Sequence, residues 1–186
     1  MLKIAFASRQ ALFFCHRTAL LAHNRLTSAV TIFRFVEVFI VQKIHFYSVN
    51  DDYGSFSNFA PYSVRIKGKL WPTTEHFFQA QKFAGQPDEE KIRKAKTPVL
   101  AAQMGRDRRR PLRRDWDSVK ISIMREALWA KFTQHQELRV ELASTKDACL
   151  VEHTENDDYW GDGGDGKGKN MLGILLMELR AKLSAP

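Results

Sequence analysis

The segment 151–172, VEHTENDDYWGDGGDGKGKNML, constrains the fold more than any other part of this 186-residue chain. Six carboxylates lie between Glu152 and Asp165, together with Trp160 and several closely spaced glycines. Such a segment cannot fill a hydrophobic core, whereas glycine lets the backbone take positive φ and approach a ligand closely. Because binding residues are concentrated on loops, the pattern predicts a polar loop that binds a small molecule. A solvated or Ca²⁺-binding loop is the alternative, although the spacing does not match an EF-hand and no bidentate glutamate closes it.

Length and composition predict one domain with a true core, since 44% of the residues are hydrophobic. The formal charge of +8 is unevenly distributed. One part lies in residues 1–42, which contain a single acid, and another lies in the arginine-rich segment 106–114. Such charges can bind nucleic acid or a phosphorylated metabolite.

Residues 1–42 are apolar, arginine-bearing and almost free of acid, which is typical of a transit-type leader. Basic residues interrupt the apolar stretch, so it is a poor secretory signal, and no apolar run approaches the ~20 residues of a membrane span. We expect a poorly ordered extension outside the core, or a segment that precedes the natural start. Cys15 and Cys149 have no zinc-motif spacing and favour a reducing compartment, so we expect a cytoplasmic protein that does not bind membranes.

The remaining chain predicts one α+β domain over residues 43–183, mainly helical with a small antiparallel sheet, and a short tail at 184–186. Strands are expected at 43–47, 62–66, 70–71 and 149–152, with the second and third forming a hairpin around Gly68. Helices are expected after Pro72 and at 89–96, 99–104, 118–135, 137–143 and 171–183.

The helix that begins after Pro72 carries the first candidate catalytic residue. One of the two threonines at 73 and 74 is the expected N-cap. Glu75 and Lys82 share one helix face with Phe78 and Gln79. The aromatic residues on either side imply that Glu75 is buried, and a buried carboxylate needs a partner or a function. A capping carboxylate beside a surface lysine is the alternative.

Lys131 lies in the apolar stripe of the helix expected at 118–135. A lysine in such a position usually buries its stem and keeps its ammonium in water. The functional interpretation is a lysine held in a pocket.

Several long motifs resemble one family in the same order along residues 43–183. They are FYSVNDDYGSFSNFAP, WPTTEHFFQAQKF, RRRPLRRDW, ALWAKF and LVEHTENDDYWGDGGDGKGKNMLGILLMELR, and the family is that of the YbiA-like or NADAR proteins. The resemblance implies a YbiA-like fold and an N-glycosidase that releases ribose 5-phosphate from the phosphoribosylamino-pyrimidine intermediates of riboflavin synthesis. Other branches imply an alternative activity, removal of ADP-ribose from guanine in DNA or from a related metabolite. A third hypothesis is a non-catalytic sensor that binds ADP-ribose.

Cleavage of an N-glycosidic bond develops positive charge at the anomeric carbon and requires a proton for the leaving nitrogen. Glu75 and Asp157 are the expected pair of carboxylates, with Asp162 in reserve. Lysine offers a second mechanism, because an amine can trap the opened sugar as a Schiff base. Lys82 and Lys131 are the candidates for that role.

The expected substrate-binding residues fall into four groups. They are aromatic rings that stack on a base, amides that bind ribose or base edges, an arginine that holds phosphate and residues of the acid-rich loop in the segment 151–172. They are Phe59, Trp71, Trp116, Trp160, Asn58, Asn170, Arg106, Gly161 and Asp162. We expect a phosphoribosylated or ADP-ribosylated small molecule as substrate, nucleic acid only as a modified substrate, and neither a metal ion nor a cofactor.

Overall fold

The computed structural model describes residues 41–185. The expectations about Cys15 and about residues 1–42 fall outside this range, except for the last two residues of that extension. In the described part of the chain, no helix combines the length and the apolar character that a membrane crossing requires.

Helices dominate the described residues, and two small pairs of strands complete the fold. The elements are β1 (Lys43–Phe46), η1 (Gly54–Phe56), β2 (Val64–Ile66), β3 (Lys69–Trp71), α2 (Thr74–Ala80), η2 (Gln81–Phe83), α3 (Pro87–Arg93), α4 (Pro98–Arg106), α5 (Trp116–Gln134), α6 (Gln136–Ser144), β4 (Cys149–Glu152) and α7 (Met171–Leu183). The expected class, a mainly helical α+β fold, is confirmed.

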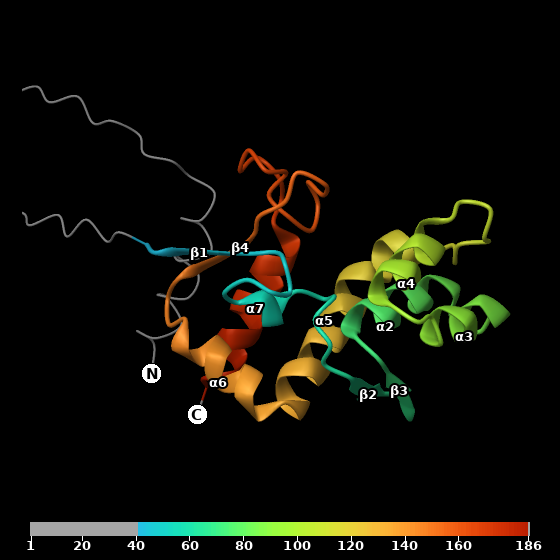
Figure 1. Ribbon diagram of the computed structural model, residues 1–186, viewed down its shortest axis with the longest axis horizontal. Coiled ribbons are helices and arrows are strands. Elements are labelled where there is room, and N and C mark those ends of the chain that lie inside the picture. Colours follow the sequence, from blue (N-terminus) through green and yellow to red (C-terminus); the bar gives the residue numbers. More distant parts are fainter. Residues whose placement is uncertain (1–40, 186) are drawn as a thin grey trace, which may run out of the picture.

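The strands pair in two ways. β2 and β3 form the expected antiparallel hairpin, with Val64 opposite Trp71 and with positive φ at Lys67 and Gly68 in the turn. β1 and β4 pair in parallel, although most of the chain separates them. Figure 1 shows these two strands side by side above α7, at the base of the loop that precedes α7. The sequence predicted both strands but not their pairing.

Helix α5 is the central element (Figure 1), with α2, α3 and α4 on one side and α7 on the other. Its apolar stripe is buried at Ala127, Leu128 and Phe132, and these side chains belong to one core cluster that spans both halves of the molecule. α5 begins at Trp116 rather than at residue 118, so Trp116 lies in the first turn of the central helix.

Capping residues fix where the site-bearing helices begin. Thr73 is the N-cap of α2, because its side chain accepts a hydrogen bond from the His76 amide at 3.3 Å. Thr97 caps α4 in the same way, with Pro98 at the first helical position. The Thr73 cap fixes where α2 begins, and so it fixes the position of Glu75 in the first turn of the helix.

Lys131 has a structural role. Its side chain is 0% exposed, and its Nζ donates hydrogen bonds to the carbonyl oxygens of Ser55 at 2.5 Å and Ser57 at 2.8 Å. Burial lowers the pKa of Lys131 to about 7, and a neutral amine still has the two N–H groups that these carbonyls need. The lysine ties α5 to η1 and has no free face for a sugar, which corrects the expectation of a catalytic Lys131.

We predict that Lys131→Met lowers the free energy of unfolding by about 2–4 kcal/mol, because each buried carbonyl left without a donor costs roughly 1–3 kcal/mol. Urea denaturation at pH 8 measures the change. Lys94→Met, which removes a surface lysine, is the control and should cost less than about 0.5 kcal/mol. Equal stability of the two variants would contradict the structural role.

Candidate active site

Glu75 is a buried carboxyl at the start of α2, 4% exposed. Its amide donates to the carbonyl of Asn58 at 3.1 Å, and its Oε1 accepts a hydrogen bond from Gln79 Nε2 at 2.8 Å. Burial raises the pKa of Glu75; the Gln79 hydrogen bond and the charges of Arg106 and Lys82 oppose this effect without cancelling it. A carboxyl in this environment holds a proton at higher pH than one in water, as a general acid requires.

Lys82 lies in η2, beyond the same face of α2. Its Nζ donates to the carbonyl of Gly105 at 3.1 Å and lies 5.5 Å from the ring centre of Trp116. Burial lowers the pKa of Lys82 to about 8, against an opposing effect of Glu75 and with a smaller contribution from Arg106. A substantial fraction of this amine is neutral near pH 8, and a neutral amine is a nucleophile.

Three aromatic rings from distant segments meet beside these two groups. The ring of Phe78, in α2, lies 5.1 Å from that of Trp116 in α5. It also lies 5.2 Å from that of Trp160, edge to face. The contact between Phe78 and Trp160 brings the acidic loop, residues 153–170 between β4 and α7, against α2. Residues far apart in sequence thus form one aromatic cluster beside Glu75 and Lys82.

Asp157 shapes the turn that presents Trp160. Its Oδ1 accepts hydrogen bonds from the amides of Tyr159 at 2.9 Å and Trp160 at 2.7 Å. Gly161 follows, where a Cβ atom would lie 2.8 Å from the carbonyl oxygens of Asp157 and Glu152. No side chain fits there, so the glycine is needed for the turn itself. The charge of Asp157 also contributes to raising the pKa of Glu75, which places Asp157 within electrostatic range of that carboxyl.

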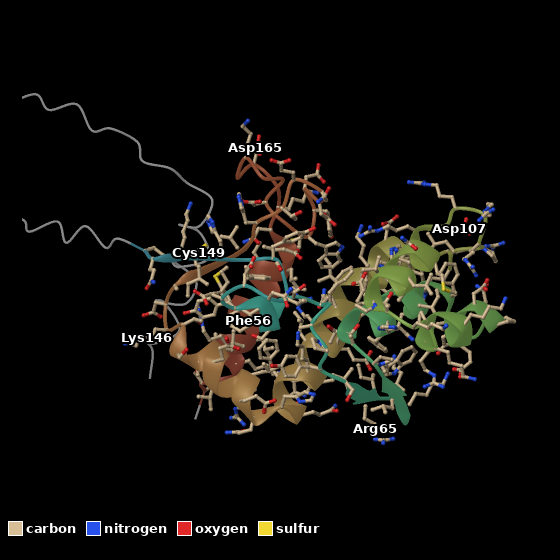
Figure 2. The ribbon with its side chains drawn as sticks, in the orientation of Figure 1. Phe56, Arg65, Asp107, Lys146, Cys149 and Asp165 are labelled. Carbon is tan, nitrogen blue, oxygen red and sulfur yellow. The ribbon has the colours of Figure 1, made fainter. Side chains whose placement is uncertain are left out.

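Asp162 organises the next part of the loop. It accepts hydrogen bonds from the amides of Thr154 at 3.2 Å and Gly164 at 2.9 Å, and it pairs with His153 Nδ1 at 2.8 Å. Burial alone would raise the pKa of Asp162, but these hydrogen bonds outweigh burial and hold it below the usual value. Figure 2 shows Asp165 near the tip of this loop, on a different side of the molecule from Asp107.

Of the two expected amides, Asn170 binds backbone groups and Asn58 contacts other side chains. Asn170, at positive φ before α7, accepts from the Glu152 amide at 3.0 Å and donates to the Leu150 carbonyl at 2.8 Å. Asn58 is buried, and its Nδ2 contacts the sulfur of Met124 at 3.4 Å. Both side chains are engaged within the protein.

A cavity of about 540 Å³ opens beside Lys82 and Trp116, within the usual size of small-molecule sites. Its lining consists of Lys82, Phe83, Gly105, Arg106, Asp107, Arg108, Arg110, Leu112 and Trp116.

The arginines around this cavity differ in their pairing. Arg109 and Arg110 pair with aspartates, as does Arg113. Arg106 and Arg108 are exposed and form no ion pair with any residue in the range 41–185. Among the arginines that line the cavity, these two are therefore the ones open to an anion.

Glu152 is a further carboxyl near Glu75, and the sequence did not single it out. Burial raises the pKa of Glu152 to about 8, with further contributions from Asp157, Glu75 and Asp162. The sequence gives no sign of its role, because only the tertiary structure places Glu152 within electrostatic range of Glu75 and Asp157. Arg108 was missed because an arginine run gives no sign of which members are paired.

The structure brings together the following expected residues: Glu75, Lys82, Arg106, Trp116, Asp157, Trp160 and Gly161. Trp71 lies elsewhere, 1% exposed, with its indole N–H bonded to the Ile66 carbonyl at 3.3 Å. It belongs to the core and has no surface for a ligand, which corrects that expectation. Phe59 is partly buried and stacks on no described ring.

Comparison with known proteins assigns this chain to a family. The NADAR domain matches residues 45–184. The chain belongs to the NADAR family. This result confirms the resemblance found in the sequence motifs.

Two relatives and one solved structure are similar over most of this NADAR chain. N-glycosidase YbiA of Escherichia coli (strain K12) is 62% identical over 141 residues, which cover 76% of this chain and 88% of that protein. The NMR structure of E. coli YbiA aligns with a TM-score of 0.73 and 59% identity, covering 81% of this chain and 90% of that one. A riboflavin biosynthesis protein of Vibrio vulnificus is 39% identical over 142 residues, covering 76% of this chain but 39% of that longer protein.

We predict that Glu152 makes the protein less stable as pH rises. Its folded pKa of about 8 lies above the ordinary 4.5, so the folded state binds the extra proton and loses this advantage between about pH 4.5 and 8. The slope reaches at most about 1.4 kcal/mol per pH unit. Glu152→Gln should remove this share of the slope in urea denaturation measured from pH 5 to 8.5.

Glu155→Gln, on the exposed side of the same loop, is the matched control and should keep the wild-type pH dependence. A Glu152→Gln protein with the wild-type slope would show that Glu152 ionises alike in the folded and unfolded states.

Proposed function

We propose that this protein cleaves the N-glycosidic bond of phosphoribosylamino-pyrimidine intermediates of riboflavin synthesis and releases ribose 5-phosphate. It is an enzyme that hydrolyses N-glycosyl bonds, in keeping with its 62% identity to a protein named N-glycosidase. The name of the Vibrio relative, a riboflavin biosynthesis protein, supports the choice of substrate.

One observation carries the proposal: a lysine of lowered pKa lines a cavity together with unpaired arginines, and a buried carboxyl lies within electrostatic range of that lysine. Glu75 and Lys82 supply a proton and a nucleophile, and Trp116 offers a ring to a flat base. Arg106 and Arg108 suit a phosphate, because a guanidinium binds phosphate oxygens through two parallel hydrogen bonds.

The arrangement favours the Schiff-base route over direct attack by water. The N-linked sugar opens to an imine, and neutral Lys82 attacks its C1. The C1–N bond to the pyrimidine breaks as Glu75 gives its proton to the leaving nitrogen. Water then hydrolyses the lysine–sugar imine, which frees ribose 5-phosphate and restores the amine. Asp157 supports the positive charge that develops at C1.

A second candidate substrate is ADP-ribosylated guanine or a related ADP-ribose metabolite. The observation that favours it is the second unpaired guanidinium, since Arg106 and Arg108 line the same cavity and offer one guanidinium for each phosphate of a diphosphate. Direct assay separates the candidates: the purified protein is incubated with each substrate and freed sugar is measured. Release from the pyrimidine intermediate supports the proposal, release only from ADP-ribosylated guanosine replaces it, and binding without release indicates a sensor.

We predict that Glu75→Gln lowers sugar release by at least about 10²-fold, because the amide cannot supply the proton. Turnover of the pyrimidine intermediate measures the effect, and thermal denaturation checks that the fold is kept. Glu178→Gln, which alters a surface glutamate on α7 paired with Arg125, is the control and should turn over like the wild type. Wild-type turnover by Glu75→Gln would exclude Glu75 from the reaction.

We also predict that borohydride traps a sugar on Lys82 during turnover. Lys82→Met should abolish the adduct, whereas Lys131→Met should still form it, and mass spectrometry of peptides locates the modified lysine. The trapping rate should rise with pH through about 8, because the attacking amine must lose its proton. An active wild-type enzyme that yields no adduct would favour direct attack by water.

A further inference from the structure

Gln79 is bound to the proposed proton donor but has no place in the chemistry described above. It lies one helical turn after Glu75 on the same face of α2, and it is 4% exposed. Its Nε2 donates to Glu75 Oε1 at 2.8 Å. One oxygen of the carboxyl is therefore engaged by an N–H group before any substrate arrives.

The other end of the Gln79 amide lies against Gly105 of α4. A Cβ atom on Gly105 would lie 2.0 Å from Gln79 Oε1 and 2.8 Å from Gln79 Cβ. The absence of a side chain at residue 105 is what leaves room for the amide. The carbonyl of the same glycine accepts the hydrogen bond of Lys82 Nζ. Gly105 therefore contacts both Lys82 and Gln79, the hydrogen-bond partner of Glu75.

The orientation of the Gln79 amide is held by Glu75. Gln79 Oε1 is buried and has no hydrogen-bond partner among the described residues, which is unfavourable for a carbonyl oxygen. The reversed amide would set Oε1 against Glu75 Oε1, oxygen to oxygen, whenever that atom is unprotonated. The stabilisation from the hydrogen bond to Glu75 thus exceeds the free-energy cost of leaving Gln79 Oε1 without a partner.

We propose that Gln79 is a positioning residue, which reserves Glu75 Oε1 as a hydrogen-bond acceptor so that Oε2 is the oxygen that carries and transfers the proton. The proposal rests on the catalytic role of Glu75 in the proposed function. Gly105 contributes to this arrangement, because its lack of a side chain leaves the space that the Gln79 amide occupies.

The charged groups that influence Glu75 come from four other elements. They are Lys82 of η2, Arg106 of α4, Asp157 of the acidic loop and Glu152 of β4. The Gln79 hydrogen bond lowers the pKa of Glu75 and is second only to burial among the effects on that carboxyl. Its loss should therefore be visible above the effects of these neighbours.

Carboxyl NMR of the full chain, labelled with ¹³C at glutamate side chains and without substrate, tests the pairing. Gln79→Met fills similar space but has no donor, and it should shift the titration midpoint of Glu75 to higher pH. Gly105→Ala, which keeps the glutamine but displaces its amide, should shift it in the same direction. Gln81→Met, at a neighbouring buried glutamine of η2, is the matched control and should not.

The wild-type protein alone provides a second measurement if a variant fails to fold. The side-chain ¹⁵N resonance of Gln79 should follow the titration of Glu75, and this dependence should vanish in Glu75→Gln. A Gln79 resonance that does not respond to Glu75, or a Glu75 midpoint unchanged in folded Gln79→Met, would overturn the proposal.

Kinetics separate a positioning role from a purely structural one. Gln79→Met should lower kcat by about 10–100-fold with a smaller change in KM, and the pH at which the rate changes should move with the NMR midpoint. A shifted midpoint with wild-type kcat would overturn the positioning role. If the wild-type protein releases sugar from neither substrate, the proposed function fails, whereas the NMR result on the Glu75–Gln79 pair still stands.

Discussion

The burial of the Glu75 carboxyl beside Lys82 is the constraint on which the rest of the site depends. Each group alone would be unfavourable in a protein interior, because burial disfavours the charged form of both acid and amine. Placed together, each favours the charged form of the other. Burial outweighs this mutual effect, so the carboxyl holds its proton more tightly and the amine releases its proton more readily than in water, the combination that acid-assisted amine chemistry requires.

The aromatic cluster makes this burial feasible. Phe78 contacts Trp116 and Trp160 at once, so α2, α5 and the acidic loop exclude water from the same side of the two groups. The cavity lies beside Lys82 and Trp116, and its lining includes the unpaired guanidinium groups of Arg106 and Arg108. The lysine of lowered pKa thus shares one cavity with two exposed groups that can bind an anion.

The acidic loop is largely a self-supporting structure. Asp162 accepts hydrogen bonds from backbone amides of the loop, and Asn170 binds the backbone of β4. The backbone contacts around Gly161 leave no room for a side chain. Two residues of the loop act on α2: Trp160 contacts the ring of Phe78, and the charge of Asp157 contributes to raising the pKa of Glu75. Asp157, Asp162 and Asp165 all accept hydrogen bonds from backbone amides of the loop, so part of the charge that makes this segment conspicuous in the sequence stabilises the shape of the loop.

The sequence by itself determined the family, the helical α+β class and the β2–β3 hairpin, because motifs, helix spacing and caps are local properties. It also predicted Glu75 and Asp157 as a pair of carboxylates and Lys82 as a candidate amine. It could not distinguish a core residue from a ligand-binding one, and so Trp71 and Lys131 were assigned to the site. Glu152, the pairing state of each arginine and the contact between Gln79 and Gly105 were decided only by the tertiary structure. The physical reason is that burial and hydrogen-bond partners arise from contacts between β1 and β4 and between α2 and α4, which no local pattern specifies.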